Sequence, residues 1–221
     1  RSGVQFAQAA RGRTNETLVF LDSHGRTYNT PAHSLPSARG QGEPLTGRFK
    51  PKDGARFVGV AMGGSATKVL LASNAGFGFI GPLADMVTKN KAGKACLSVS
   101  AGAEALPPIV IPPAVLEAND GLVAAVTNQG RLLIFKLADL PELSRGKGNK
   151  LINIPGAAFK AGEESMLAVA VLGEGDELIV HAGQRHLTMK RKDYDNYIGE
   201  RARRGGKLPR GFQKVDRLTV G

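Results

Sequence analysis

Hydrophobic and polar positions along the chain repeat one pattern: an apolar run, a turn that ends in glycine, a second strand-like run, and a basic loop. The first runs are Leu18–Leu21, Val69–Ala72, Leu122–Val126 and Leu178–Val180. The turn glycines are Gly25, Gly76, Gly130 and Gly183, and their spacings are 51, 54 and 53 residues. Runs of β-branched or aliphatic residues joined by a short turn, with glycine where positive φ is needed, predict β-hairpins.

A repeat of this length with about four strands per unit is typical of a bladed β structure. A single blade cannot bury its own apolar faces, so one domain is favoured. We therefore expect an all-β, propeller-like disc of four-stranded blades, and the sequence leaves open whether the ring is complete. The predicted divisions are the tail of a preceding blade (1–16), three blades (17–64, 65–118 and 119–173) and a degenerate last blade (174–221).

Other segments complete each repeat. The similar triplets Ala84–Met86 and Ala138–Leu140 predict a short helical turn that plugs the blade. The proline-rich run Leu106–Pro113 excludes helix and suits an edge strand or a linker. Closing strands are predicted at Phe57–Val60, Ile109–Ile111, Met166–Val171 and Val215–Val220.

The chain is strongly basic, with 30 Lys and Arg against 19 Asp and Glu, a net charge of +11. Residues 185–214 hold ten basic and three acidic residues. Glycine lets backbone N–H groups approach phosphate, and neighbouring cations neutralise it. The 12 aromatic residues do not interleave with the basic loops, which argues against stacking on single strands. Duplex DNA bound through its phosphates, with strong salt dependence, is therefore the expected partner. The basic loops are Arg39–Gly42, Lys91–Lys94, Arg145–Gly148 and Arg203–Lys207.

Catalytic chemistry is not indicated. The four histidines lack metal-ligand spacing, and Gly63–Lys68 lacks the spacing of a phosphate loop. Cys96 lies in a predicted strand and is expected to be a buried small hydrophobe. A propeller hydrolase would need convergent carboxylates, whereas Asp85, Asp139 and Asp193 recur only as expected turn caps. We expect no catalytic, cofactor-binding or metal-binding residue in this chain. A propeller-like protein-interaction scaffold remains an alternative.

No apolar run reaches the about 18 residues that a membrane span needs, and no signal peptide is visible. The chain begins at Arg1 rather than methionine, so we expect a fragment of a longer protein.

Several segments closely resemble the C-terminal domain of ParC, the DNA-cleaving subunit of bacterial topoisomerase IV, and the resemblance runs from about residue 4 to residue 220. These segments are Leu35–Gly47, Asn90–Ala95, Gly130–Phe135, Leu140–Pro155 and Gly199–Gly206. The corresponding subunit of gyrase, a related enzyme, carries an intact Gln-Arg-Arg-Gly-Gly-Arg-Gly-type box that wraps DNA. No loop here contains the whole box, although Arg203–Lys207 approaches part of it. This departure favours topoisomerase IV, with a gyrase-type wrapping domain as the alternative.

The resemblance implies a β-pinwheel whose blades exchange strands and whose outer rim binds double-stranded DNA. The implied role is to hold, orient and bend DNA, supporting decatenation and supercoil relaxation by the parent enzyme. That enzyme is implied to be an A2B2 assembly in which the ParE subunit hydrolyses ATP. Its ParC subunit would cleave DNA with a tyrosine, using Mg²⁺, in a region outside this chain. The implied location is the bacterial cytoplasm, at the nucleoid and with peripheral association to the inner membrane. The isolated fragment is expected to be monomeric.

The candidate DNA contacts are cations in or near the basic loops. The first-ranked residues are Arg39, Lys91, Lys94, Arg145, Lys147, Lys150, Arg203, Arg204 and Lys207. The second-ranked residues are Arg48, Arg131, Arg185 and Arg201.

Overall fold

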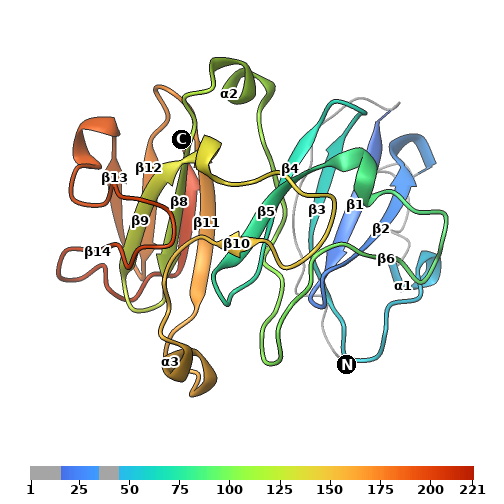
Figure 1. Cartoon of the computed structure of the whole chain (residues 1–221), viewed down its shortest axis with the longest axis horizontal. Helices are drawn as coiled ribbons and strands as arrows, with labels where there is room; N and C mark the ends of the chain where they lie inside the picture. The colour runs from blue at the N-terminus through green and yellow to red at the C-terminus, as the bar shows by residue number, and fades with distance from the viewer. Residues whose placement is uncertain (1–15, 35–44) are drawn as a thin grey trace.

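The computed structural model describes residues 16–34 and 45–221. They form three four-stranded antiparallel sheets and one three-stranded sheet. The sheets follow one another along the long axis of the molecule, with β1 and β2 towards one end and β12 and β13 towards the other (Figure 1). The fold is therefore all-β, as predicted, and the described sheets form an open arc rather than a closed ring.

Each predicted hairpin is present. The register pairs Leu21 with Thr27 in the first and His181 with His186 in the last. The last turn is tighter because Ala182 already pairs with Arg185, which leaves two residues between the strands. The hairpins are β1 (Thr17–Asp22) with β2 (Arg26–Pro31), β4 (Lys68–Ala72) with β5 (Phe77–Pro82), β8 (Leu122–Thr127) with β9 (Arg131–Lys136), and β12 (Leu178–Ala182) with β13 (Arg185–Met189).

The closing strands and the helical plugs also agree with prediction. The third strand of each blade is β3 (Phe57–Gly63), β7 (Ile109–Val110), β11 (Met166–Leu172) or β15 (Arg217–Val220). Every hairpin is followed by a 3-10 turn, namely η1 (Ala32–Ser34), η2 (Leu83–Met86), η3 (Leu137–Asp139) or η4 (Arg191–Asp193). In the second blade Leu83 and Met86 are buried, so this turn does plug the blade.

Three short α-helices complete the described chain: α1 (Leu45–Arg48), α2 (Pro113–Ala118) and α3 (Gly156–Lys160). The proline-rich run forms the predicted edge strand, β7, but the exclusion of helix was wrong at its end. Pro113 opens α2, and proline is favoured there because the first helical N–H has no partner within the helix.

The fourth strand of each complete blade comes from the following repeat. The exchanged strands are β6 (Lys94–Ala95), β10 (Asn149–Lys150) and β14 (Gly206–Lys207), which pair with β2, β5 and β9 respectively. The last sheet has the order β13-β12-β15, and no described residue supplies a fourth strand to β13. This exchange is the arrangement that the family resemblance implied.

Three of the four core clusters lie between consecutive sheets, and the fourth packs Phe20 and Tyr28 of the first sheet against Phe49. Val19 and Leu21 pack with Leu71 and Phe79 between the first two sheets. Two further clusters fill the spaces between the second and third sheets and between the third and fourth. The middle sheets are therefore buried on both faces, and their strands contain continuous apolar runs such as Leu122–Val126.

Single residues of interest lie in this core. Cys96 is buried, as predicted, and burial raises the pKa of its thiol. Tyr194 and Tyr197 are buried between the third and fourth sheets, although they lie in a charged segment of the sequence.

Candidate nucleic-acid interface

The turn glycine of each complete blade is the docking point for the exchanged segment. The carbonyl oxygen of Gly25 accepts hydrogen bonds from the N–H groups of Cys96 and Leu97, at 3.1 and 3.0 Å. Gly76 accepts from Leu151 at 2.7 Å, and Gly130 accepts from Leu208 at 2.9 Å. These glycines have φ of 87°, 90° and 76°, in the left-handed region. Glycine therefore serves both the turn and the close approach of the neighbouring repeat.

The docked segments also bond to one another. The segments from the second and third repeats are joined because Ser98 N–H donates to Gly146 O and Gly146 N–H donates to Cys96 O, both at 2.9 Å. The segments from the third and fourth repeats are joined because Ala202 N–H donates to Leu151 O and Asn153 N–H donates to Arg203 O, also at 2.9 Å. We call residues 90–98, 145–154 and 201–208 together the exchanged rim. Three of the four predicted basic loops thus lie on one hydrogen-bonded belt, and the fourth, Arg39–Gly42, lies outside the described residues.

Five of the predicted cations on this rim are exposed: Lys91, Arg145, Lys147, Arg203 and Lys207. The Lys147 ammonium lies 4.0 Å from the centroid of the Phe77 ring, a cation–π contact that restrains but does not bury it. Arg203 pairs with Glu200 at 3.1 Å, but its side chain is 72% exposed. Such a surface pair is weak, so the arginine is available to another anion.

Three of the second-ranked arginines instead bond to main-chain oxygens. Arg201 donates from Nε to Asp139 O at 2.9 Å and from Nη1 to Lys150 O at 2.8 Å. Arg131 donates to Gly205 O at 3.4 Å, and Arg48 donates to Ser34 O at 2.7 Å. These groups hold segments of the chain together.

The remaining predicted residues are placed as follows. Lys94 donates to Asp85 O at 2.5 Å, and Lys150 donates to Asn153 Oδ1 at 3.2 Å, so both ammonium groups have partners within the protein. Arg185 is exposed and begins β13, the strand to which no described residue adds an exchanged strand. Arg39 lies outside the described residues.

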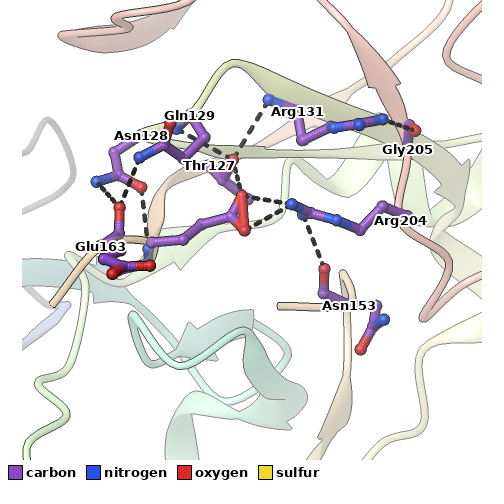
Figure 2. Close-up of polar contacts among 10 residues, drawn as sticks. Thr127, Asn128, Gln129, Arg131, Asn153, Glu163, Arg204 and Gly205 are labelled. Atoms are coloured by element: carbon purple, nitrogen blue, oxygen red, sulfur yellow. Dashed lines mark hydrogen bonds and ion pairs between the residues drawn. The ribbon is translucent and has the colours of Figure 1, made fainter. Parts of the chain in front are cut away.

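Arg204 lies in a network that the sequence did not indicate. Its Nη2 donates to both carboxylate oxygens of Glu164, at 2.6 and 2.9 Å, and its Nη1 donates to Asn153 O at 3.1 Å. Thr127 Oγ1 donates to the same carboxylate at 3.0 Å. Figure 2 shows Arg204 extended between Asn153 and the carboxylate next to Thr127. No sequence signal identified Glu164, because its partner follows 40 residues later and a single acidic residue has no period.

Within residues 16–34 and 45–221, no three His, Cys, Asp or Glu side chains are grouped so that they could hold a metal ion. None of the helices described is long and apolar enough to cross a membrane. The exchanged rim carries exposed cations, with glycines among them.

Comparison with known proteins places this fold in a family. The model of the DNA gyrase C-terminal domain, a β-propeller, matches residues 17–61 and 122–180. The A subunit of DNA topoisomerase 4 from Pseudomonas aeruginosa is 50% identical over 220 residues, covering 100% of this chain and 29% of that protein. The Escherichia coli K12 protein of the same name is 42% identical, with 100% and 28% covered. The chain thus spans less than a third of these relatives.

Solved structures agree. The E. coli ParC C-terminal domain matches with a TM-score of 0.84 and 41% identity, over 98% of this chain and 85% of that one. A DNA gyrase A C-terminal domain matches with a TM-score of 0.70 at 13% identity, over 95% and 67%, a likeness of fold alone. The exchanged strands, the open arc and the identity to a domain of nearly the same extent together show that this chain belongs to the family of C-terminal domains of the topoisomerase IV protein ParC.

Proposed function

We propose that this domain binds duplex DNA through its phosphates along the exchanged rim, as the non-catalytic C-terminal module of a topoisomerase IV ParC protein. The observation that carries the proposal is the hydrogen-bonded belt that joins three basic loops end to end. Five exposed cations lie on this belt, so a duplex following it would meet a cation from each loop in turn. Contacts to phosphate position DNA without selecting its sequence, which suits an enzyme acting at many sites.

In the parent enzyme the module would hold and orient one DNA segment for decatenation and relaxation. Cleavage by a tyrosine with Mg²⁺, and ATP hydrolysis by the ParE subunit of an A2B2 assembly, would occur outside this chain. The location proposed for the parent enzyme is the bacterial cytoplasm, at the nucleoid.

Four rim cations are the first choices for phosphate contact: Lys91, Arg145, Arg203 and Lys207. They are exposed, and their side chains are not committed to main-chain oxygens as those of Arg201 and Arg204 are. Lys147 is a second choice because its ammonium already contacts Phe77.

The test is binding of a labelled duplex across a salt series. Lys91→Glu/Lys207→Glu is compared with Lys136→Glu/Lys192→Glu, which makes the same charge change at exposed lysines outside the rim. We expect the rim variant to bind more weakly and to lower the slope of log K against log salt by about 2, at about 0.9 per lost phosphate contact. The control should keep the wild-type slope. Equal effects of the two variants would show that only net charge matters and would contradict a rim interface.

A further inference from the structure

We propose that Glu164 strengthens DNA binding, although it is acidic, because it acts through Arg204 as a positioning residue for the last loop of the exchanged rim. This inference rests on the proposed function. From charge alone, Arg204 would be expected to contact phosphate and Glu164 to repel it. The inference gives both residues a structural role instead.

The first support is the burial of the Glu164 carboxylate against a half-buried Arg204. The Glu164 side chain is 3% exposed and that of Arg204 is 34% exposed, with a shortest distance of 2.6 Å. Both carboxylate oxygens contact Arg204, and one also accepts a hydrogen bond from buried Thr127. An arginine held in this way by a carboxylate is fixed in direction as well as position.

The second support is what the pair holds. Arg204 lies between the exposed cations Arg203 and Lys207. Through Asn153 O it is tied to the preceding exchanged segment, and through Glu164 to the loop that leads into β11. The pair therefore fixes the backbone that carries Arg203 and Lys207 against two other parts of the domain.

The third support is the conformation of this backbone. Ala202 has φ of 73°, a left-handed conformation that a residue with a Cβ holds only when its surroundings impose it. Gly205 has φ of 77°, and a Cβ there would lie 2.5 Å from Leu132 O. The loop is thus held in a conformation with little intrinsic preference, so it depends on its anchors.

The effect of removing the Glu164 charge on DNA binding distinguishes a purely electrostatic role from a positioning role. Removing the Glu164 charge makes the domain more basic, so electrostatics alone predicts tighter DNA binding. If Glu164 instead positions the loop, its loss misplaces Arg203 and Lys207, and binding weakens.

The experiment uses the whole chain, a labelled duplex and a salt series, and compares Glu164→Gln with Glu163→Gln. The control removes the same charge one residue away. Glu163 is exposed, and its main-chain carbonyl accepts the bonds from Asn128 and Gln129. We expect Glu164→Gln to weaken binding about three- to tenfold and to lower the salt slope by about 1 to 2, the loss of one or two phosphates. Glu163→Gln should bind as the wild type does or slightly more tightly, with an unchanged slope.

The salt slope separates positioning from loss of folded protein, because partial unfolding lowers the active fraction but not the number of phosphates contacted by each folded molecule. Arg204→Gln completes the comparison. If Glu164 acts through Arg204, adding Glu164→Gln to Arg204→Gln causes no further loss of affinity. This double variant leaves no unpaired charge, so it remains informative if the single variant fails to fold, and its slope should be reduced.

A Glu164→Gln domain that binds as tightly as Glu163→Gln would overturn the positioning role, as would a double variant with the wild-type slope. A wild-type domain that shows no salt-dependent duplex binding would overturn the proposed function and this inference with it. The two failures are distinguished by whether the wild type binds.

Discussion

The main-chain N–H of Leu151 donates a 2.7 Å hydrogen bond to the carbonyl oxygen of Gly76, 75 residues earlier, and so ties one repeat to the turn of the one before. The same bond joins Leu97 to Gly25 and Leu208 to Gly130. Gly183, the fourth turn glycine, has no such partner among the described residues. A Cβ built at Gly183 meets no atom within 4 Å. The same hydrogen bond to a turn glycine therefore docks the following repeat in three blades, and it is absent at the last turn among the described residues.

This difference predicts unequal costs for two glycine substitutions. Gly25→Ala should destabilise the domain by about 3 kcal/mol or more, because a Cβ would lie 1.8 Å from Leu97 O in addition to the strain of positive φ. Gly183→Ala should cost only the strain, about 1–2 kcal/mol. Urea unfolding of both variants measures the difference, and similar costs would show that Gly25 serves only its turn.

Tyr28 should make the domain sensitive to alkali. Its hydroxyl donates to Asp22 Oδ2 at 2.7 Å, and burial, then this hydrogen bond, then the Asp22 charge raise the Tyr28 pKa above its ordinary value. A raised pKa means that the folded state favours the neutral phenol. This stabilisation is complete below the unfolded pKa of about 10 and is lost progressively as pH rises from there through the folded pKa.

Tyr28→Phe should therefore cost about 1–2 kcal/mol at neutral pH, because Asp22 loses a donor, and should reduce the loss of stability above pH of about 10. Tyr197→Phe is the control, since burial alone raises the Tyr197 pKa. It should reduce the alkaline loss with little cost at neutral pH. Thermal unfolding across pH tests both variants, and a neutral-pH cost no greater for Tyr28→Phe than for the control would contradict the role of the Asp22 bond.

Two ion pairs should differ in their contribution to stability. Glu164→Gln should cost about 2 kcal/mol, because it weakens charged hydrogen bonds at a buried carboxylate. Glu104→Gln should cost less than about 1 kcal/mol, because the Arg56–Glu104 pair is 59% and 46% exposed despite its distance of 2.6 Å. Denaturant unfolding at low and high salt compares them, and only the Glu104 effect should fall with salt.

The exposed pair also has a pH dependence of known sign. The hydrogen bond from Arg56 lowers the Glu104 pKa, so its stabilisation is present above the unfolded value of about 4.3 and is lost as pH falls through the folded pKa. Arg56→Gln should reduce this acid-dependent loss. An unchanged acid profile would show that solvent already screens the pair.

Cys96 should report on the undocking of an exchanged segment. It follows β6, its N–H bonds to Gly25 O, and burial raises the pKa of its thiol. Alkylation of the folded domain should therefore be slow at neutral pH and become complete in urea. Gly25→Ala should accelerate alkylation under native conditions, whereas Gly183→Ala should not, because it lies in another blade. Equal rates in both variants would indicate global rather than local opening.

Local sequence determined the hairpins, plugs and closing strands. Their signals are apolar runs and turn glycines close together in the chain, as at Leu18–Leu21 and Gly25, and the interactions that form them span only a few residues. The resemblance to the ParC C-terminal domain predicted the pinwheel and its exchanged strands, which composition and spacing did not indicate. The boundaries of β6, β10 and β14 were not predicted, because a two-residue strand is too short to show a period.

Only the tertiary structure distinguished the cations from one another. In sequence, Arg203 and Arg204 are equivalent members of one basic loop. In the folded domain Arg203 is exposed beside Glu200, while Arg204 is committed to Glu164 and Asn153. The physical reason is distance along the chain: whether an arginine meets solvent or a buried carboxylate depends on which remote segment the fold brings beside it. Composition and spacing therefore predicted a basic surface, and the docking of one repeat on another decided which charges remain on it.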